Sequence, residues 1–308
     1  MTVIGVDIGG TKAFAVRIGE DGSRADERFL LDRSMSLVDA ISLAIDKVSD
    51  GPFDGIGVGI AGLVRKQDGV MIWGPHVSGN DVPVRALLET KYDVPVVVDN
   101  DANTAAIAEF RTGAGAGYGN GLLVTLGTGI GGAIVIGGSV YRGGSFAGEW
   151  GHVRVESGGL LCDCGKRGCW ETKASGPALM RLAREVIVAN PDGSLARALG
   201  ESPLSGEAVV GAADAGEETA RALVTEVGRA FGQGLADLIA IFDPEVVVVG
   251  GGLGSVGESI VGPARRVVTD SIHGGKLRVP PTIHVAALGQ AAGAVGAAML
   301  AREDLHVR

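Results

Sequence analysis

Apolar residues follow two patterns along this chain, one typical of buried strands and one of amphipathic helices. Apolar runs at residues 3–8 and 13–18 predict two strands, and the glycine turn at 9–12 between them predicts a hairpin. Apolar residues at helical spacing predict a helix over residues 36–48. The chain therefore begins with a strand pair followed by a helix.

Strands and helices then alternate through the rest of the chain. Short apolar runs and helical spacings predict strands at 55–61, 94–98, 121–126, 133–136 and 246–249, and helices at 101–111, 177–188, 217–242 and 290–301. The hairpin pattern returns at 121–136, roughly 120 residues after its first copy, with a glycine turn at 127–132. The repeat predicts a duplicated α/β domain.

The two copies also suggest where the chain divides. No linker is rich in proline or serine, so we place the boundary near residues 107–120, between the copies. The expected domains are an N-terminal α/β domain at 1–107 and a larger C-terminal α/β domain at 108–289. The C-terminal helix, at about 290–308, is expected to pack back on the first domain.

Composition excludes several classes of protein. Hydrophobic residues make up 46% of the 308 residues, which supports a sizeable core. A net charge of −9 argues against a nucleic-acid partner. The N-terminus lacks the pattern of a signal peptide, and no apolar stretch reaches the roughly 18 residues of a membrane span. We therefore expect no membrane partner and a cytoplasmic location.

All three cysteines lie close together, at Cys162, Cys164 and Cys169, and His152 lies ten positions upstream of the first. Three thiolates and one imidazole complete the tetrahedral ligand set that zinc prefers. A disulfide would leave one thiol unpaired, and a single residue between the first two cysteines does not fit a redox CxxC motif. The cluster therefore predicts a structural zinc site, with three unrelated buried cysteines as the alternative.

Three glycine loops follow predicted strands, at 9–12, 127–132 and 250–254. Successive backbone N–H groups in such turns form an anion-binding nest, so the two hairpins would grip the phosphates of ATP from both sides. The third loop would offer the nucleoside a flat surface, and Asp7 suits Mg²⁺ bound through water. Each loop alone is compatible with an ordinary turn. The candidate nucleotide-binding residues are Asp7, Gly9, Gly10, Thr11, Lys12, Gly127, Thr128, Gly129, Gly251 and Gly252.

Two of these loops also match the G-x-G-x-x-G pattern of dinucleotide-binding proteins. The match at 127–132 precedes an apolar, strand-like segment, whereas a dinucleotide loop must open a helix. The match at 252–257 does precede a predicted helix, which leaves a nicotinamide-dependent oxidoreductase as an alternative. That alternative leaves the cysteine cluster unexplained.

A polar segment at 99–103 follows the strand at 94–98. Phosphoryl transfer to a hydroxyl needs a base at the attacking oxygen, and a side chain at a strand-to-helix junction can face a cleft. Asp101 is the candidate base. The competing interpretation is a helix cap, which Asp99, Asn100 or Asn103 could supply while Asp101 performs the chemistry.

Six motifs follow one another along the chain. They are Asp7-Ile-Gly-Gly-Thr-Lys12, Asp99-Asn-Asp-Ala-Asn103, Leu126-Gly-Thr-Gly-Ile-Gly-Gly132, Gly148-Glu-Trp-Gly-His152, Cys162-x-Cys-Gly-x-x-Gly-Cys-x-Glu171 and Gly250-Gly-Gly. In this order they resemble the ROK family of sugar kinases and repressors, and most of all its bacterial glucokinase members. The resemblance runs from residue 3 to about residue 300, and the cysteine motif with its upstream histidine is highly specific.

The resemblance implies an actin-like ATPase fold, with ribonuclease H-like duplicated domains, an interdomain cleft and a structural zinc site. It implies ATP-dependent phosphorylation of glucose at the 6-hydroxyl, with Asp101 as the general base and Asn100 on a sugar hydroxyl. Glu149, His152 and Glu171 would also bind the sugar. Apolar neighbours of Glu149 favour its burial. The implied cofactors are ATP, Mg²⁺ and structural Zn²⁺, and the implied assembly is a homodimer or homotetramer.

Two departures from the family pattern leave the identity of the hexose open. Relatives often carry Pro-Asn-Leu-Pro-Gly-Trp where this chain has Pro75-His-Val-Ser-Gly-Asn80, beside the sugar site of the family, and Lys173 replaces a common tyrosine. The alternatives are a kinase for N-acetylmannosamine, N-acetylglucosamine, mannose or fructose, and a glucokinase that uses polyphosphate. A sugar-sensing repressor is disfavoured, because its DNA-binding module would precede the first hairpin, which here begins at residue 3.

Overall fold

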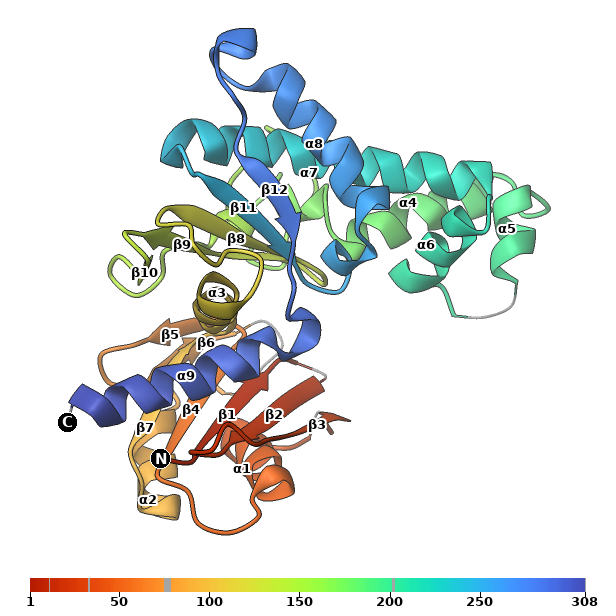
Figure 1. Ribbon diagram of the computed structural model, residues 1–308. Helices are drawn as coiled ribbons and strands as arrows, with labels where there is room; N and C mark the ends of the chain where they lie inside the picture. Colours follow the sequence, from red (N-terminus) through yellow and green to blue (C-terminus); the bar gives the residue numbers. More distant parts are fainter. Residues whose placement is uncertain (11, 33, 75–78, 201–202, 308) are drawn as a thin grey trace. The chain divides into compact units, whose positions relative to one another are not determined.

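The computed structural model describes residues 1–10, 12–32, 34–74, 79–200 and 203–307 (Figure 1). Within them lie two five-stranded sheets and one two-stranded sheet. The first sheet has the order β3 (Arg24–Leu30), β2 (Lys12–Ile18), β1 (Val3–Ile8), β4 (Gly55–Ile60) and β7 (Val96–Asn100). The second has the order β10 (Ser139–Tyr141), β9 (Ile130–Ile136), β8 (Gly121–Leu126), β11 (Val246–Gly250) and β12 (Thr282–Val285). The small sheet pairs β5 (Leu63–Arg65) with β6 (Val70–Trp73).

The two large sheets have the same topology. In each, the strands taken in chain order occupy the positions third, second, first, fourth and fifth across the sheet. In the first sheet β1 pairs antiparallel with β2 and parallel with β4, and in the second β10 pairs antiparallel with β9 and β11 parallel with β12. The predicted duplication of a mixed α/β unit is therefore confirmed.

The sequence pattern did not predict β3, β5, β6, β10 or β12. Strand β3 is almost wholly exposed and four of its seven residues are charged, and it lies at the edge of its sheet, where one side of the backbone needs no partner. The other four strands have only three or four residues, too few to display an alternating pattern.

The α-helices lie between and after these strands. Predicted helices correspond to α1, α3, α4, α7 and α9, and α8 is the helix expected after residues 252–257. Helices α2, α5 and α6 were not predicted, because they have only six to nine residues, too few to display a clear helical period. The bounds are α1 (Leu37–Val48), α2 (Val84–Tyr92), α3 (Asp101–Thr112), α4 (Gly176–Ala189), α5 (Ser194–Leu199), α6 (Gly206–Asp214), α7 (Glu218–Phe242), α8 (Glu258–Ser271) and α9 (Ala292–Val307).

The chain forms two compact units. The first comprises residues 1–123, 133–148 and 287–308, and the second comprises 124–132 and 149–286. Helix α3 continues without a break past residue 107, where the sequence pattern placed a boundary, and the first unit extends to Leu123. Residues 108–123 stay with the first unit because Ala108 of α3 packs in one cluster with Ala294 and Ala298 of α9.

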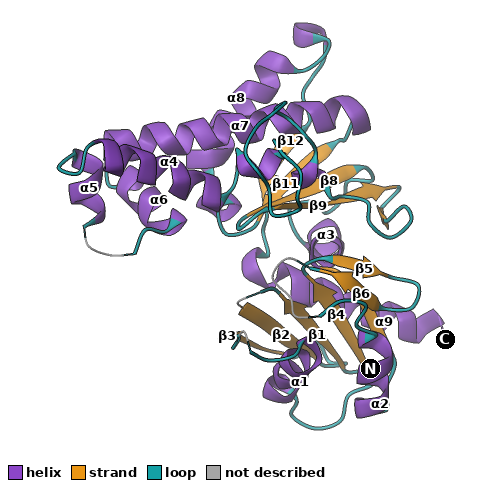
Figure 2. Ribbon diagram, turned by 180° about the vertical axis from the view of Figure 1, so that it is seen from behind, coloured by secondary structure: helices purple, strands orange, loops and turns teal. Residues whose placement is uncertain are grey.

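The first sheet has helices on both faces (Figures 1 and 2). Side chains of α1 and α2 join one buried cluster with β1, β4 and β7, and side chains of α3 and α9 join another with β1 and β2. Helix α9 approaches the sheet so closely that a Cβ atom at Gly57 would lie 1.8 Å from the carbonyl oxygen of Ala297. Glycine is therefore required at this position of β4.

Helices dominate the second unit (Figure 2). Helix α7 packs against α8, where Gly232 meets Ala264. The Trp170 ring stacks on Phe231 with centroids 5.4 Å apart, and its Nε1 donates to Ala230 O at 3.0 Å. These contacts fix the short 3-10 turn η2 (Trp170–Thr172) on α7. Within the described residues, every helix is too short or too polar to cross a membrane.

Candidate functional site

The predicted base lies at the junction of β7 and α3, in the first unit. Asn100 begins α3: its Oδ1 accepts hydrogen bonds from the backbone of Ala102 and Asn103 at 2.9 and 3.2 Å, and its Nδ2 donates to Gly62 O at 3.1 Å. Asn100 is thus the helix cap, and its side chain also hydrogen-bonds the Asp101 carboxylate, which favours the ionised form of Asp101. Asp101 is the first residue of α3, and the acceptor of the N-cap is Asn100 rather than its carboxylate.

Asp101 shares its surroundings with Asp7, at the carboxyl end of β1. Sheet register places Asp7 beside Gly59 of β4, and a Cβ atom on that glycine would lie 3.4 Å from Asp101 Cα. Burial raises the pKa of Asp101 above its usual range. Burial, and then the charge of Asp101, raise the pKa of Asp7 to about 8. Two carboxyl groups in one poorly solvated place compete for a proton, unless a cation compensates their charge.

The first glycine hairpin joins β1 to β2. Gly9 N donates to Lys12 O at 3.0 Å and closes the turn, and Lys12 is exposed at the start of β2. Gly9 and Gly10 lie within this turn, as predicted, whereas the predicted hydroxyl of Thr11 lies outside the described residues. Asp7 precedes the same turn, so the structure places the predicted magnesium residue and the first hairpin at one end of the sheet.

The second glycine hairpin and the third loop meet in the second unit. Gly127 N donates to Gly129 O at 3.0 Å, and Gly127 O accepts from Gly176 N at the start of α4. Gly251 has φ +83°, and a Cβ atom there would lie 2.5 Å from Leu126 O, so only glycine fits. Five of the predicted nucleotide-binding residues thus surround the end of β8: Gly127, Thr128, Gly129, Gly251 and Gly252. The side chain of Thr128 is exposed.

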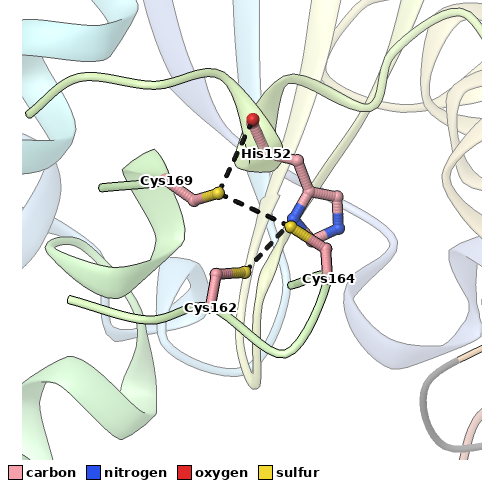
Figure 3. Close-up of side chains that lie close together, drawn as sticks. All are labelled: His152, Cys162, Cys164 and Cys169. Atoms are coloured by element: carbon pink, nitrogen blue, oxygen red, sulfur yellow. Dashed lines mark hydrogen bonds between the residues drawn. The ribbon is translucent and has the colours of Figure 1, made fainter. Parts of the chain in front are cut away.

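The four predicted metal ligands converge in the second unit (Figure 3). Their donor atoms all lie within 4.8 Å of one another. The Sγ atoms of Cys164 and Cys169 are 3.6 Å apart, and Cys162 Sγ is 3.5 Å from His152 Nδ1. Tetrahedral zinc with standard bond lengths requires separations of about 3.8 Å between sulfurs and about 3.5 Å between sulfur and nitrogen. The three thiols are free, so the donor set fits Zn²⁺ in both chemistry and spacing.

Glu171 connects this cluster to the second hairpin. Its Oε1 lies 2.9 Å from Cys162 Sγ and 3.2 Å from His152 Nδ1, and its Oε2 accepts from Ile130 N at 3.4 Å. Burial opposes ionisation, yet the hydrogen bonds from His152 and Cys162 keep the pKa of Glu171 below its usual value. The predicted sugar ligand Glu171 is therefore a charged group held at the edge of the cluster of His152 and the three cysteines.

Glu149 precedes the 3-10 turn η1 (Trp150–His152), which is fixed on the second hairpin. Trp150 is buried, and its Nε1 donates to Gly131 O at 3.1 Å. The expected burial of Glu149 is wrong: this residue is exposed, and its neighbour Phe146 is 42% exposed, because Trp150 turns inward and leaves the preceding residues at the surface. An exposed carboxylate remains accessible to a polar ligand.

Arg142 contacts the 99–103 segment, and sequence patterns did not reveal it. It follows β10, and its Nε donates to Asp99 Oδ2 at 2.7 Å, so it contacts the segment that carries the predicted base. The only available signal was an arginine before two glycines, which is common in surface turns. The departure at residues 75–80 falls largely on 75–78, outside the described residues.

The paired sheets and glycine hairpins define an actin-like α/β fold, the fold of a large class of ATP-dependent sugar kinases. Within that class, the chain belongs to the ROK family, because the sequence model of that family matches residues 3–304. The resemblance noted in the sequence is thereby confirmed.

Named relatives cover nearly the whole chain. The glucokinase of Streptomyces coelicolor is 39% identical over 308 residues, which span 97% of this chain and 97% of that protein. The crystal structure of a ROK family glucokinase from Streptomyces griseus, in complex with glucose and AMPPNP, has a TM-score of 0.90 at 39% identity, covering 98% and 100% of the two chains. The ROK hexokinase from Thermus thermophilus has a TM-score of 0.76 at 32% identity and covers all of both chains.

Proposed function

We propose that this chain is a glucokinase that transfers the γ-phosphoryl group of ATP to the 6-hydroxyl of glucose. The observation that carries the proposal is Asp101, a carboxylate at the start of α3 that the helix cap does not use and whose pKa burial raises. Similarity to two Streptomyces glucokinases at 39% identity supports the choice of glucose and ATP.

In the proposed reaction Asp101 accepts the proton of the 6-hydroxyl as that oxygen attacks the γ-phosphorus and ADP leaves. The side chain of Asn100, together with Glu149, Glu171 and the Nε2 atom of His152, would bind the other sugar hydroxyls. His152 suits this task because its Nδ1 faces the cysteine cluster and leaves Nε2 free.

The nucleotide would bind through backbone N–H groups of the two hairpins, with Gly251 and Gly252 beside the nucleoside. Asp7 would hold Mg²⁺ through water, and Mg²⁺ when bound neutralises phosphate charge. His152, Cys162, Cys164 and Cys169 would hold a structural Zn²⁺, and Glu171 lies against this cluster. Free thiols and the use of ATP support a cytoplasmic location. A homodimer or homotetramer stays a prediction, which light scattering would test.

The hexose and the phosphoryl donor are tested together. ADP release is followed with ATP over a panel of glucose, mannose, fructose, N-acetylmannosamine and N-acetylglucosamine, and glucose 6-phosphate formation is followed with polyphosphate. We expect glucose with ATP to give the highest kcat/KM. A higher kcat/KM for another hexose, or for polyphosphate, would replace glucose or ATP in the proposal.

The role of Asp101 is tested by Asp101→Asn, which keeps the shape of the side chain and removes the base. We expect glucose binding to persist, while kcat falls by about two to four orders of magnitude. Asp68→Asn, at a surface ion pair with Arg65, is the matched control and should leave kcat unchanged. Near-normal turnover of Asp101→Asn would rule out this base.

The metal is tested by Cys164→Ser, which removes one thiolate. We expect elemental analysis of the purified wild type to give one zinc per chain, and the variant to lose both zinc and glucose affinity, because His152 and Glu171 lose their support. Zinc retained in the variant, or a wild type without zinc, would contradict the proposed site.

A further inference from the structure

Asp99 lies two residues before the proposed base and is buried, with 1% of the residue exposed. Its carboxylate accepts three hydrogen bonds: Oδ1 accepts from Asn100 N and from Asn103 Nδ2, each at 2.9 Å, and Oδ2 accepts from Arg142 Nε at 2.7 Å. These bonds fix the backbone and side chains around Asp101.

Arg142 extends this network to another segment of the first unit. Its guanidinium also donates from Nη1 to Val140 O at 3.0 Å, which ties it to the end of β10. Its carbonyl oxygen accepts from Ser145 N at 2.9 Å and from Ala147 N at 3.2 Å, so Arg142 also closes the turn that follows. The chain then passes through Gly148 directly into Glu149.

The turn after Arg142 has a strained backbone. Ser145 is 6% exposed and has φ +105°, a conformation that residues with a side chain rarely adopt. Such a conformation persists only where surrounding contacts hold it, and it occurs often at functional sites. The contacts here are the two hydrogen bonds to Arg142 O, and the Arg142 side chain is in turn held by Asp99.

We propose that the Asp99–Arg142 ion pair positions residues of the sugar site. It holds the turn at 99–101, which carries the base, in a fixed position relative to the loop 142–148, which leads to Glu149. The inference rests on the proposed function. Neither residue touches the reacting atoms. Their effect on the reaction comes from the placement of Asp101 and of the loop that leads to Glu149.

Other charged groups surround the pair. Burial lowers the pKa of Lys66, and Arg142 and Arg85 act in the same direction, whereas Asp99 and Asp304 counteract them. Asp99 thus supplies negative charge in surroundings rich in cations. Loss of the Asp99 charge would leave Arg142 without its ion-pair partner, and we expect the guanidinium to move away from the base turn.

The test uses Asp99→Asn, Arg142→Met and Arg142→Lys, together with the double variant Asp99→Asn/Arg142→Met. Asp68→Asn is the matched control, because Asp68 also pairs with an arginine at 2.7 Å but lies far more exposed. For each folded variant, kcat and the KM values for glucose and ATP are measured, with glucose affinity by calorimetry as a second readout.

We expect each of the first two variants to lower kcat/KM for glucose on the order of tenfold to hundredfold, because misplacement of about 1 Å has such an effect, while the KM for ATP changes less than about twofold. The double variant should resemble the single variants rather than multiply their losses. Arg142→Lys should restore part of the activity through its charge, and Asp68→Asn should match the wild type.

The wild-type hexose panel is measured first, so that two failures can be told apart. A wild type that releases no ADP with any hexose contradicts the proposed function. If the wild type is active, the inference is overturned by variants with unchanged kcat/KM for the sugar, by equal losses for ATP and glucose, or by a double variant that multiplies the losses.

Discussion

Asp7 and Asp101 show how neighbouring residues change each other's chemistry. Both carboxyl groups lie at the carboxyl ends of parallel strands, next to Gly59, and burial raises the pKa of each. A base must be ionised to accept a proton. Activity that depends on Asp101 should therefore rise with pH and level off above an apparent pKa that is higher than 3.8, which a pH profile of kcat/KM measures.

Asp7 also makes stability depend on pH. In the unfolded chain Asp7 ionises near 3.8, whereas in the folded chain it keeps its proton up to about 8, so folding loses free energy as pH rises between these values. The neutral substitution Asp7→Asn removes this loss. Relative to wild type, the variant should gain stability from pH 5 to 8 by at most about 1.4 kcal/mol per pH unit.

This comparison uses urea unfolding without Mg²⁺ or nucleotide, because a cation at Asp7 would lower its pKa. If the free energy of unfolding changes with pH equally in wild type and in Asp7→Asn, Asp7 is already ionised at pH 5 and the prediction is wrong. Asp26→Asn, at an exposed carboxylate of β3, provides the control and should give parallel profiles.

At the scale of elements, the first sheet depends on the close approach of α9. A Cβ atom at Gly57 of β4 would overlap the backbone of Ala297, and neither backbone can move without disturbing the sheet. We expect Gly57→Ala to lower the free energy of unfolding by roughly 3 kcal/mol or more, since overpacking against backbone relaxes poorly.

Gly211→Ala is the matched control for this substitution. Gly211 lies inside α6, where an added Cβ atom meets no neighbour within 4 Å. Because alanine favours helix, this variant should gain about 0.5–1 kcal/mol. Chemical denaturation of both variants measures the difference, and equal stabilities would contradict the described packing of α9.

At the scale of the whole molecule, the chain passes from one unit to the other several times. One of these passages, at Ala287, is held by the buried carboxylate of Glu109. Glu109 of α3 is fully buried, and its carboxylate accepts from Leu288 N at 2.7 Å, Ala287 N at 3.1 Å and Ala114 N at 2.9 Å. Ala287 is the residue at which the chain re-enters the first unit. Glu109 therefore anchors both this return and the segment that leaves α3.

Glu109→Gln should weaken this anchor, because an amide nitrogen would face backbone donors in place of a charged acceptor. We expect a loss of about 1–3 kcal/mol of stability and faster hydrogen exchange at the amides of Ala287 and Leu288. Glu185→Gln, at an exposed pair with Arg181, should change neither quantity. Unchanged protection of the 287–288 amides would contradict the anchor.

The sequence by itself determined the duplicated fold, the family and the identity of the candidate site residues. Strands β1 and β8, their glycine turns and the cysteine motif are local patterns, in which adjacent residues carry the whole signal. Helix α1, with its cap at Ser36, follows from the same kind of pattern.

Only the tertiary structure decided how those residues are supported. The supporting contacts join residues up to 178 positions apart. They are those of Asp99 with Arg142, of Glu109 with Ala287, and of Glu171 with His152 and Ile130. No periodicity encodes such pairs, because each depends on which strand ends and helix starts the folded backbone brings together. The same holds for the exposure of Glu149, since the inward turn of Trp150 is set by the hairpin beneath it.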